Sequence, residues 1–191
     1  MIKFFTEWLA NRRKRRSQFL NELLMVGKHL PLELMKSQKY PLPAISGKYF
    51  GFFLSVEGQF QKNNPKPYRI RGVVQLPKSI LSRVYLHSEE RPATLKPIAT
   101  LKLIHTKDPL FENKFLLMSD NEKLALSLFQ PYLRQRLLSL GDTHWLLDIQ
   151  KMEAHIEMQT SILNGRQWMY SIRVIAELLN SLLALEKYES S

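Results

Sequence analysis

Few residues in this sequence have the types and spacing of a reactive site. Glu153, His155 and Glu157 alternate in the segment EAHIE, so on a strand all three would share one face and could chelate a metal ion. Ala154 and Ile156 would then belong to the buried face, and the three polar residues would form its solvated side. Because the ligand set is incomplete and no second motif converges on it, we expect neither a metal nor another cofactor.

The other chemical motifs fail for specific reasons. The segment ISGK at Ile45–Lys48 has the Gly-Lys pair of a phosphate-binding loop, but it lacks the upstream glycine. Tyr49 also stands where a magnesium-binding Ser or Thr is needed. The sequence has no cysteine, which excludes disulfides and thiolate chemistry. The sequence shows no pattern that would bring a nucleophile, a base and an orienting group together, so we expect a non-enzymatic protein.

The most distinctive chemistry is a run of five cations that follows a group of apolar and aromatic residues. Aromatic anchors beside a polybasic patch are typical of a helix that lies on anionic lipid, where each cation contributes on the order of 1 kcal/mol. The same pattern suits docking on a partner protein. We therefore expect an accessory or interaction domain that binds a membrane-associated protein assembly or an anionic membrane surface. The predicted docking residues are Phe4, Phe5, Trp8, Leu9, Arg12, Arg13, Lys14, Arg15 and Arg16.

Two alternatives stay open for this segment. Its apolar side chains could pack on the protein's own core while the cations face water. Alternatively, the cations could neutralise nucleic-acid phosphates, together with further cations on an expected strand and in the turn before it. These secondary anion-binding candidates are Lys62, Lys66, Arg69 and Arg71.

The distribution of charge favours an anionic partner for the first half of the chain. The 191 residues carry a net charge of +11. Residues 1–107 have 20 Lys and Arg against 6 Asp and Glu, whereas residues 108–191 have 8 against 11. Such asymmetry is typical of one region that meets a polyanion. No apolar run reaches the roughly 18 residues of a membrane span, and Glu7 and the cations interrupt any signal-peptide core, so we expect a cytoplasmic protein peripheral to a membrane.

The docking residues must be positioned by an N-terminal helix. Residues 2–27 contain no Pro and end at Gly27, which predicts one helix. On a helical wheel, three arginines fall on the apolar side and divide the apolar stripe in two. Residues 1–16 are therefore expected to serve an external surface, whereas the helix beyond Ser17 serves the fold.

The remaining pattern predicts strands in runs rather than in strict alternation with helices. This order indicates an α+β fold with a largely antiparallel sheet, a basic N-terminal helix, a helix pair interrupted at Pro131 and a C-terminal amphipathic helix. We expect a basic helical extension over residues 1–42 and an α+β core domain over residues 43–191. The other predicted elements are a short helical turn at 31–37, strands at 48–60, 68–76, 83–87, 98–106 and 113–119, and a hairpin over 144–162.

Residues 108–140 combine turn and core residues in a distinctive order. An Asp and a Phe precede a short strand and a polar turn, and a helix interrupted at Pro then leads into a Leu-rich turn. In this order the segment resembles a loose group of bacterial domains of unknown function that often follow membrane helices, and the likeness extends over about residues 47–185. The resemblance implies a domain on the cytoplasmic side of a membrane and carries no active site. The matching residues are Asp108, Phe111, Phe115, Asp120, Pro131, Leu137 and Leu138.

Overall fold

The computed structural model describes residues 2–35, 44–61, 64–88, 100–141 and 143–189. In this part of the chain, nine strands form one sheet, and every neighbouring pair of strands is antiparallel. The strands are β1 (Glu33–Met35), β2 (Ala44–Tyr49), β3 (Phe52–Phe60), β4 (Tyr68–Gln75), β5 (Val84–Ser88), β6 (Lys102–Leu103), β7 (Phe115–Ser119), β8 (His144–Gln150) and β9 (Glu153–Thr160). The helices are α1 (Ile2–His29), α2 (Pro109–Glu112), α3 (Glu122–Leu128), α4 (Pro131–Leu138) and α5 (Gly165–Glu189).

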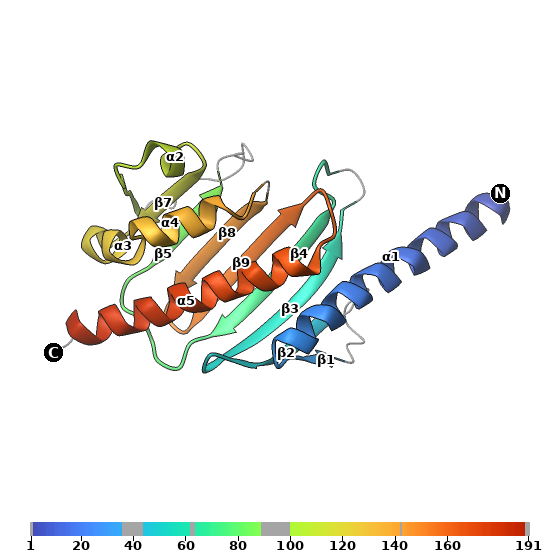
Figure 1. Ribbon diagram of the computed structural model, residues 1–191, viewed down its shortest axis with the longest axis horizontal. Coiled ribbons are helices and arrows are strands. Elements are labelled where there is room, and N and C mark those ends of the chain that lie inside the picture. The colour runs from blue at the N-terminus through green and yellow to red at the C-terminus, as the bar shows by residue number, and fades with distance from the viewer. Residues whose placement is uncertain (1, 36–43, 62–63, 89–99, 142, 190–191) are drawn as a thin grey trace.

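The strand order is β1-β2-β3-β4-β9-β8-β5-β7-β6, so β9 pairs with β4 in the middle of the sheet. Helices α1 and α5 lie side by side across one face of the sheet, and α3 and α4 continue this helical layer beside α5 (Figure 1). The predicted α+β class with a largely antiparallel sheet and a C-terminal helix is confirmed.

Alternation along the central strands decides which face the helices cover. In β4, Ile70 and Val74 are buried, whereas Arg69 and Arg71 point to the other face. In β9, Ile156 is buried in the same way. Since side chains alternate between the two faces of a strand, the apolar set contacts the helices and the polar set lies on the face that we call the open face. Within the described residues, no helix lies on the open face.

Helix α5 supplies the largest apolar stripe of the helical layer. Trp168, Ile172, Ile175 and Leu179 recur at helical spacing and are all buried. By length and composition alone, the segment Gly165–Leu185 is apolar enough to cross a membrane. Half of its most apolar stretch is buried inside the fold, which is the arrangement of a core helix.

The second half of α1 belongs to the same core. Phe19, Leu23 and Leu30 are fully buried, and the ring of Phe19 stacks on Trp168 of α5 at a centroid distance of 5.8 Å. A Cβ atom at Gly58 of β3 would lie 2.6 Å from the Phe19 ring, so this strand position requires glycine for the helix to approach. Residues 19–32 of the expected 1–42 extension therefore share one core with residues 43–191.

The first half of α1 extends past the end of the sheet. Its N-terminal turns lie beyond the neighbouring strands in Figure 1, while its C-terminal turns lie against β2 and β3. At a rise of 1.5 Å per residue, residues 2–16 span roughly 22 Å of helix. The predicted helix over residues 2–27 is confirmed and continues to His29.

The structure corrects three local predictions. In the predicted helical turn over 31–37, the described residues 31–35 are not helical, because Glu33–Met35 is a short edge strand that pairs with β2. Residues 48–60 are two strands, since Phe50 and Gly51 form a turn between β2 and β3. The strand predicted over 98–106 is reduced to Lys102–Leu103 in the described part.

Local capping explains the helices that flank β7. The Asp108 side chain accepts a hydrogen bond from the Phe111 amide and begins the four-residue helix α2, which was not predicted. Asn121 caps α3 in the same way. Pro131 occupies the first turn of α4, where its missing N–H has no helical partner to lose, so the predicted Pro-interrupted helix pair is confirmed.

Replacing Phe19 tests whether α1 is part of the fold. We expect Phe19→Ala to lower the free energy of unfolding by about 3–5 kcal/mol, because it removes a fully buried ring and leaves a cavity between α1, α5 and β3. Leu24→Ala on the same helix is the matched control, since Leu24 is 48% exposed. Urea unfolding of both variants measures the difference, and equal losses would show that the second half of α1 is not anchored in the core.

Candidate functional site

The predicted docking segment lies entirely within the first half of α1. Lys14 is exposed. The side chains of the other docking residues lie outside the described residues, so their contacts are not placed. The docking segment consists of Phe4, Phe5, Trp8, Leu9, Arg12, Arg13, Lys14, Arg15 and Arg16.

The four secondary anion-binding candidates do not form one cationic face. Lys62 lies outside the described residues, and Lys66 is buried, with 7% of its surface exposed. Arg69 and Arg71 both point to the open face, where Glu157 of the neighbouring strand β9 faces them. One carboxylate therefore offsets part of the charge of these two arginines.

Glu157 is the centre of the polar network on the open face. Its carboxylate accepts a close charged hydrogen bond from the Arg69 guanidinium and a second one, at 3.3 Å, from Arg71 Nε. Gln159 Nε2 donates to the other carboxylate oxygen at 2.8 Å. Burial would raise the pKa of Glu157, but the hydrogen bonds from Arg69 and Gln159 and the nearby positive charges outweigh it and hold this pKa below its ordinary value.

Two adjoining cavities hollow the open face on either side of Glu157. The larger cavity has a volume of about 490 Å³ and is lined by β3, β4 and β9, with Glu57, Val73 and His155 on its walls. The smaller cavity has a volume of about 230 Å³ and reaches β8 and His87 of β5. Leu146 and Glu157 line both cavities, so together they form one shallow depression across the central strands.

The remaining polar groups near the depression are also largely compensated. Arg83 forms a bidentate ion pair with Asp148. Its Nε and Nη2 atoms donate to the two carboxylate oxygens at 2.9 and 2.6 Å. Tyr85 lies beside them with its hydroxyl buried and unpaired among the described residues, and burial raises the pKa of Tyr85. Its ring stacks parallel to His87 at 6.3 Å, and burial lowers the pKa of His87, so this imidazole is neutral at pH 7.

Glu153, His155 and Glu157 share the open face as their alternation predicts. His155 Nε2 lies 3.1 Å from Glu153 Oε2, while Glu157 is held by the arginines of β4. Within the described part of the chain, no three His, Cys, Asp or Glu side chains are grouped as a metal site.

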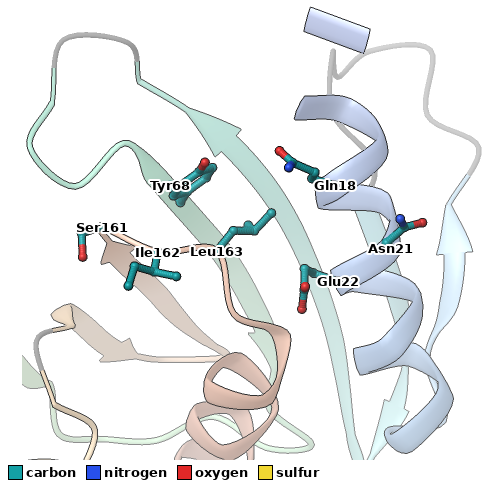
Figure 2. A pocket seen from close by; sticks show the side chains of 7 residues that line it. All are labelled: Gln18, Asn21, Glu22, Tyr68, Ser161, Ile162 and Leu163. Carbon is teal, nitrogen blue, oxygen red and sulfur yellow. The ribbon is translucent and has the colours of Figure 1, made fainter. Parts of the chain in front are cut away.

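A separate cavity, away from the open face, lies between α1 and the turn that follows β9 (Figure 2). It has a volume of about 370 Å³, and its walls include Asn21, Tyr68 and Ile162. Glu22 on its floor accepts a hydrogen bond of 2.6 Å from the Gly165 amide at the start of α5. Asn164 accepts from the next two amides. Because the first amides of α5 already have partners, this cleft is not an anion site.

Sequence reasoning missed the role of Glu157 and of Glu22. We expected the polar side of β9 to be solvated. Two arginines on β4 and one glutamate on β9 alternate in the same way, and once the two strands pair, this pattern predicts an ion pair between them. Glu22 is 143 positions from its partner Gly165. No local sequence pattern predicts a hydrogen bond between residues so far apart in the chain.

The fold defines a class of α+β domain in which one antiparallel sheet carries helices on a single face. Neither a protein-family model nor a curated protein matches the sequence. The fold is similar to the crystal structure of the mycobacterial trehalose monomycolate transport factor A, TtfA, with a TM-score of 0.57 and 12% sequence identity. The match covers 90% of this chain and 93% of that chain. At this identity, the likeness concerns the fold alone.

We expect Glu157→Gln to lower the free energy of unfolding by about 1–3 kcal/mol at pH 7, because it leaves two guanidinium groups without their carboxylate. The pKa of Glu157 is lowered from an ordinary value of 4.5. The stabilisation is therefore present above pH 4.5 and is lost as the pH falls through the lowered pKa. Unfolding of the wild type and the variant across this pH range measures it, and a difference that stays constant into strong acid would contradict the assignment.

Proposed function

We propose that this protein is a non-enzymatic accessory domain that docks, through the basic and aromatic first half of α1, on a membrane-associated protein assembly or an anionic membrane surface. The body of the domain holds the helix, and the docking segment makes the contact. The protein would act at the cytoplasmic side of a membrane as a peripheral component.

The division of α1 into two halves carries this proposal. Its second half is fixed in the core by Phe19, Leu23 and Leu30. Its first half continues as a helix beyond the end of the sheet (Figure 1). A helical extension with five consecutive cations and three aromatic residues has the composition of an interfacial or partner-binding helix.

Two further observations support an accessory role. The fold is similar to that of a protein named as a transport factor, and the word factor in that name is consistent with an accessory role. The open face carries charged side chains that are mostly paired with one another, which suits a binding module more than a reaction centre.

Nucleic-acid binding is the alternative use of the same cations. It is less well supported, because Arg69 and Arg71 are paired with Glu157 and Lys66 is buried. Few strand cations are therefore left to neutralise phosphates beside the docking segment. A steep dependence of oligonucleotide binding on salt concentration would favour this alternative.

Replacing Trp8 by Ala together with Arg12 by Glu tests the proposed docking. The double change removes one aromatic anchor and inverts one charge, so we expect at least about a tenfold loss of binding to its target. The measurement is co-purification of the tagged full chain from native membranes in mild detergent, with quantitative identification of the retained proteins and lipids.

Leu110→Ala with Lys123→Glu is the matched control. It makes the same kind of apolar and charge change at exposed positions on α2 and α3. We expect the control to retain the wild-type partners. Equal retention by both variants would remove the proposed function.

A further inference from the structure

A second candidate interaction surface lies at the end of the sheet opposite the docking segment. Here the tight turn between β2 and β3 and the tight turn between β8 and β9 flank the end of β4. Large apolar side chains are exposed in these turns, at the start of β3 and in the segment that follows β4. We call the surface formed by these segments the turn end, and its exposed apolar residues are Phe50 (61% exposed), Phe53 (48%), Leu81 (88%) and Met152 (44%).

Backbone hydrogen bonds hold the parts of the turn end together. The Leu76 amide donates to the Met152 carbonyl at 2.8 Å, and the Ile80 amide donates to the Lys151 carbonyl at 2.9 Å. The segment after β4 therefore lies against the β8–β9 turn. Phe53 pairs with Gln75 at the end of β4, which extends the same surface to the β2–β3 turn.

The β2–β3 turn uses residues that do not favour its conformation. Phe50 and Gly51 have φ values of 52° and 84°. A two-residue turn with positive φ at both positions is normally occupied by Asn-Gly or Asp-Gly, because a bulky side chain is strained in the left-handed region. Phe50 is mostly exposed, and its main described contact is an edge-on one with Tyr49 at 4.7 Å. Phenylalanine at this position contributes little to folding, whereas a role in binding would explain its presence.

Positive charge surrounds these apolar residues. Lys48, Lys78 and Lys151 are all exposed. In the segments 48–53, 75–83 and 150–153, the one carboxylate is that of Glu153, and it accepts a hydrogen bond of 2.8 Å from Gln75. The turn end thus combines exposed apolar groups with a net positive charge.

We propose that the turn end docks on the surface of an anionic lipid bilayer, with its apolar side chains in the headgroup region and its three lysines against lipid phosphates. The composition favours lipid over a protein partner. Lysine is depleted in protein interfaces, whereas exposed lysines beside apolar anchors strengthen contact with anionic lipid. Separate turn tips also need no complementary shape in a bilayer, unlike in a protein interface.

This inference specifies the geometry of the proposed docking. The turn end and the first half of α1 lie at opposite ends of the sheet (Figure 1). A bilayer that meets the sheet end-on at these turns therefore lies at the far end of the molecule from the docking segment. With lipid at the turn end, the docking segment points away from that bilayer and toward a protein assembly.

The test is sedimentation of the full chain with vesicles of phosphatidylcholine alone or with phosphatidylglycerol as one third of the lipid. We expect Phe50→Asn to weaken binding to the anionic vesicles by roughly tenfold. Lys78→Gln with Lys151→Gln should weaken binding to the anionic vesicles by about fivefold for each charge removed. The wild type and both variants should bind the neutral vesicles only weakly. Since Asn-Gly suits the β2–β3 turn, the melting temperature of Phe50→Asn should be unchanged or higher by roughly 2–4 °C.

Two controls separate this inference from the proposed function. Leu110→Asn with Lys123→Gln changes equally exposed positions elsewhere and should bind vesicles like the wild type. The Trp8→Ala, Arg12→Glu variant should lose its co-purified partner and keep vesicle binding. Vesicle binding that survives Phe50→Asn, or that is lost through the Trp8 and Arg12 changes instead, would overturn the lipid assignment of the turn end.

Discussion

The contact of Phe19 with β3 and α5 determines what this protein can present to a partner. The ring lies against Gly58, where any Cβ would collide with it, and it stacks on Trp168. This contact sets the position of α1 along the strands, with the second half of the helix on the sheet and the first half beyond it. A longer buried stripe would have drawn the whole helix onto the core. Burying an unpaired guanidinium group costs several kcal/mol, so a sequence rich in arginine is poorly suited to such a stripe.

Charge on the open face is arranged on a different principle. Arg69 and Glu157 are 18% and 17% exposed, so each would be costly without the other. The cross-strand pairing of β4 with β9 neutralises charge where the strands are half-buried. The net charge of +11 is consequently carried elsewhere, with large shares in α1 and in the exposed lysines of the turn end. The positive charge of this protein is therefore concentrated at two ends of the molecule, in α1 and at the turn end, rather than spread over one uniformly basic surface.

Periodicity and capping residues made much of the fold predictable. The alternation in Tyr68–Gln75, the proline that begins α4 and the apolar stripe of α5 are local signals, and each corresponds to an element of the structure. Edge strand β1 escaped prediction because its residues favour a helix in isolation and form a strand only by pairing with β2. The helical wheel of residues 2–27 predicted a helix with two differently placed halves, but where the helix crosses the end of the sheet depends on the long-range contacts of Phe19 with β3 and α5.

The β2–β3 turn is a place where the failure of sequence-based prediction points to function. A turn is recognised in sequence by residues that stabilise it, and Phe-Gly lacks the Asn or Asp that would have divided the predicted strand over 48–60. The same departure makes the position informative, because tight hairpins readily accept Asn-Gly and gain stability from it. When local sequence preference and structure disagree at a mostly exposed position, packing within the chain offers little compensation, and a contact outside the folded chain is the better explanation. At this end of the sheet the disagreement falls on a mostly exposed phenylalanine and on the exposed Lys151, whose φ is 50°, which is why we assign the turns to lipid contact rather than to folding.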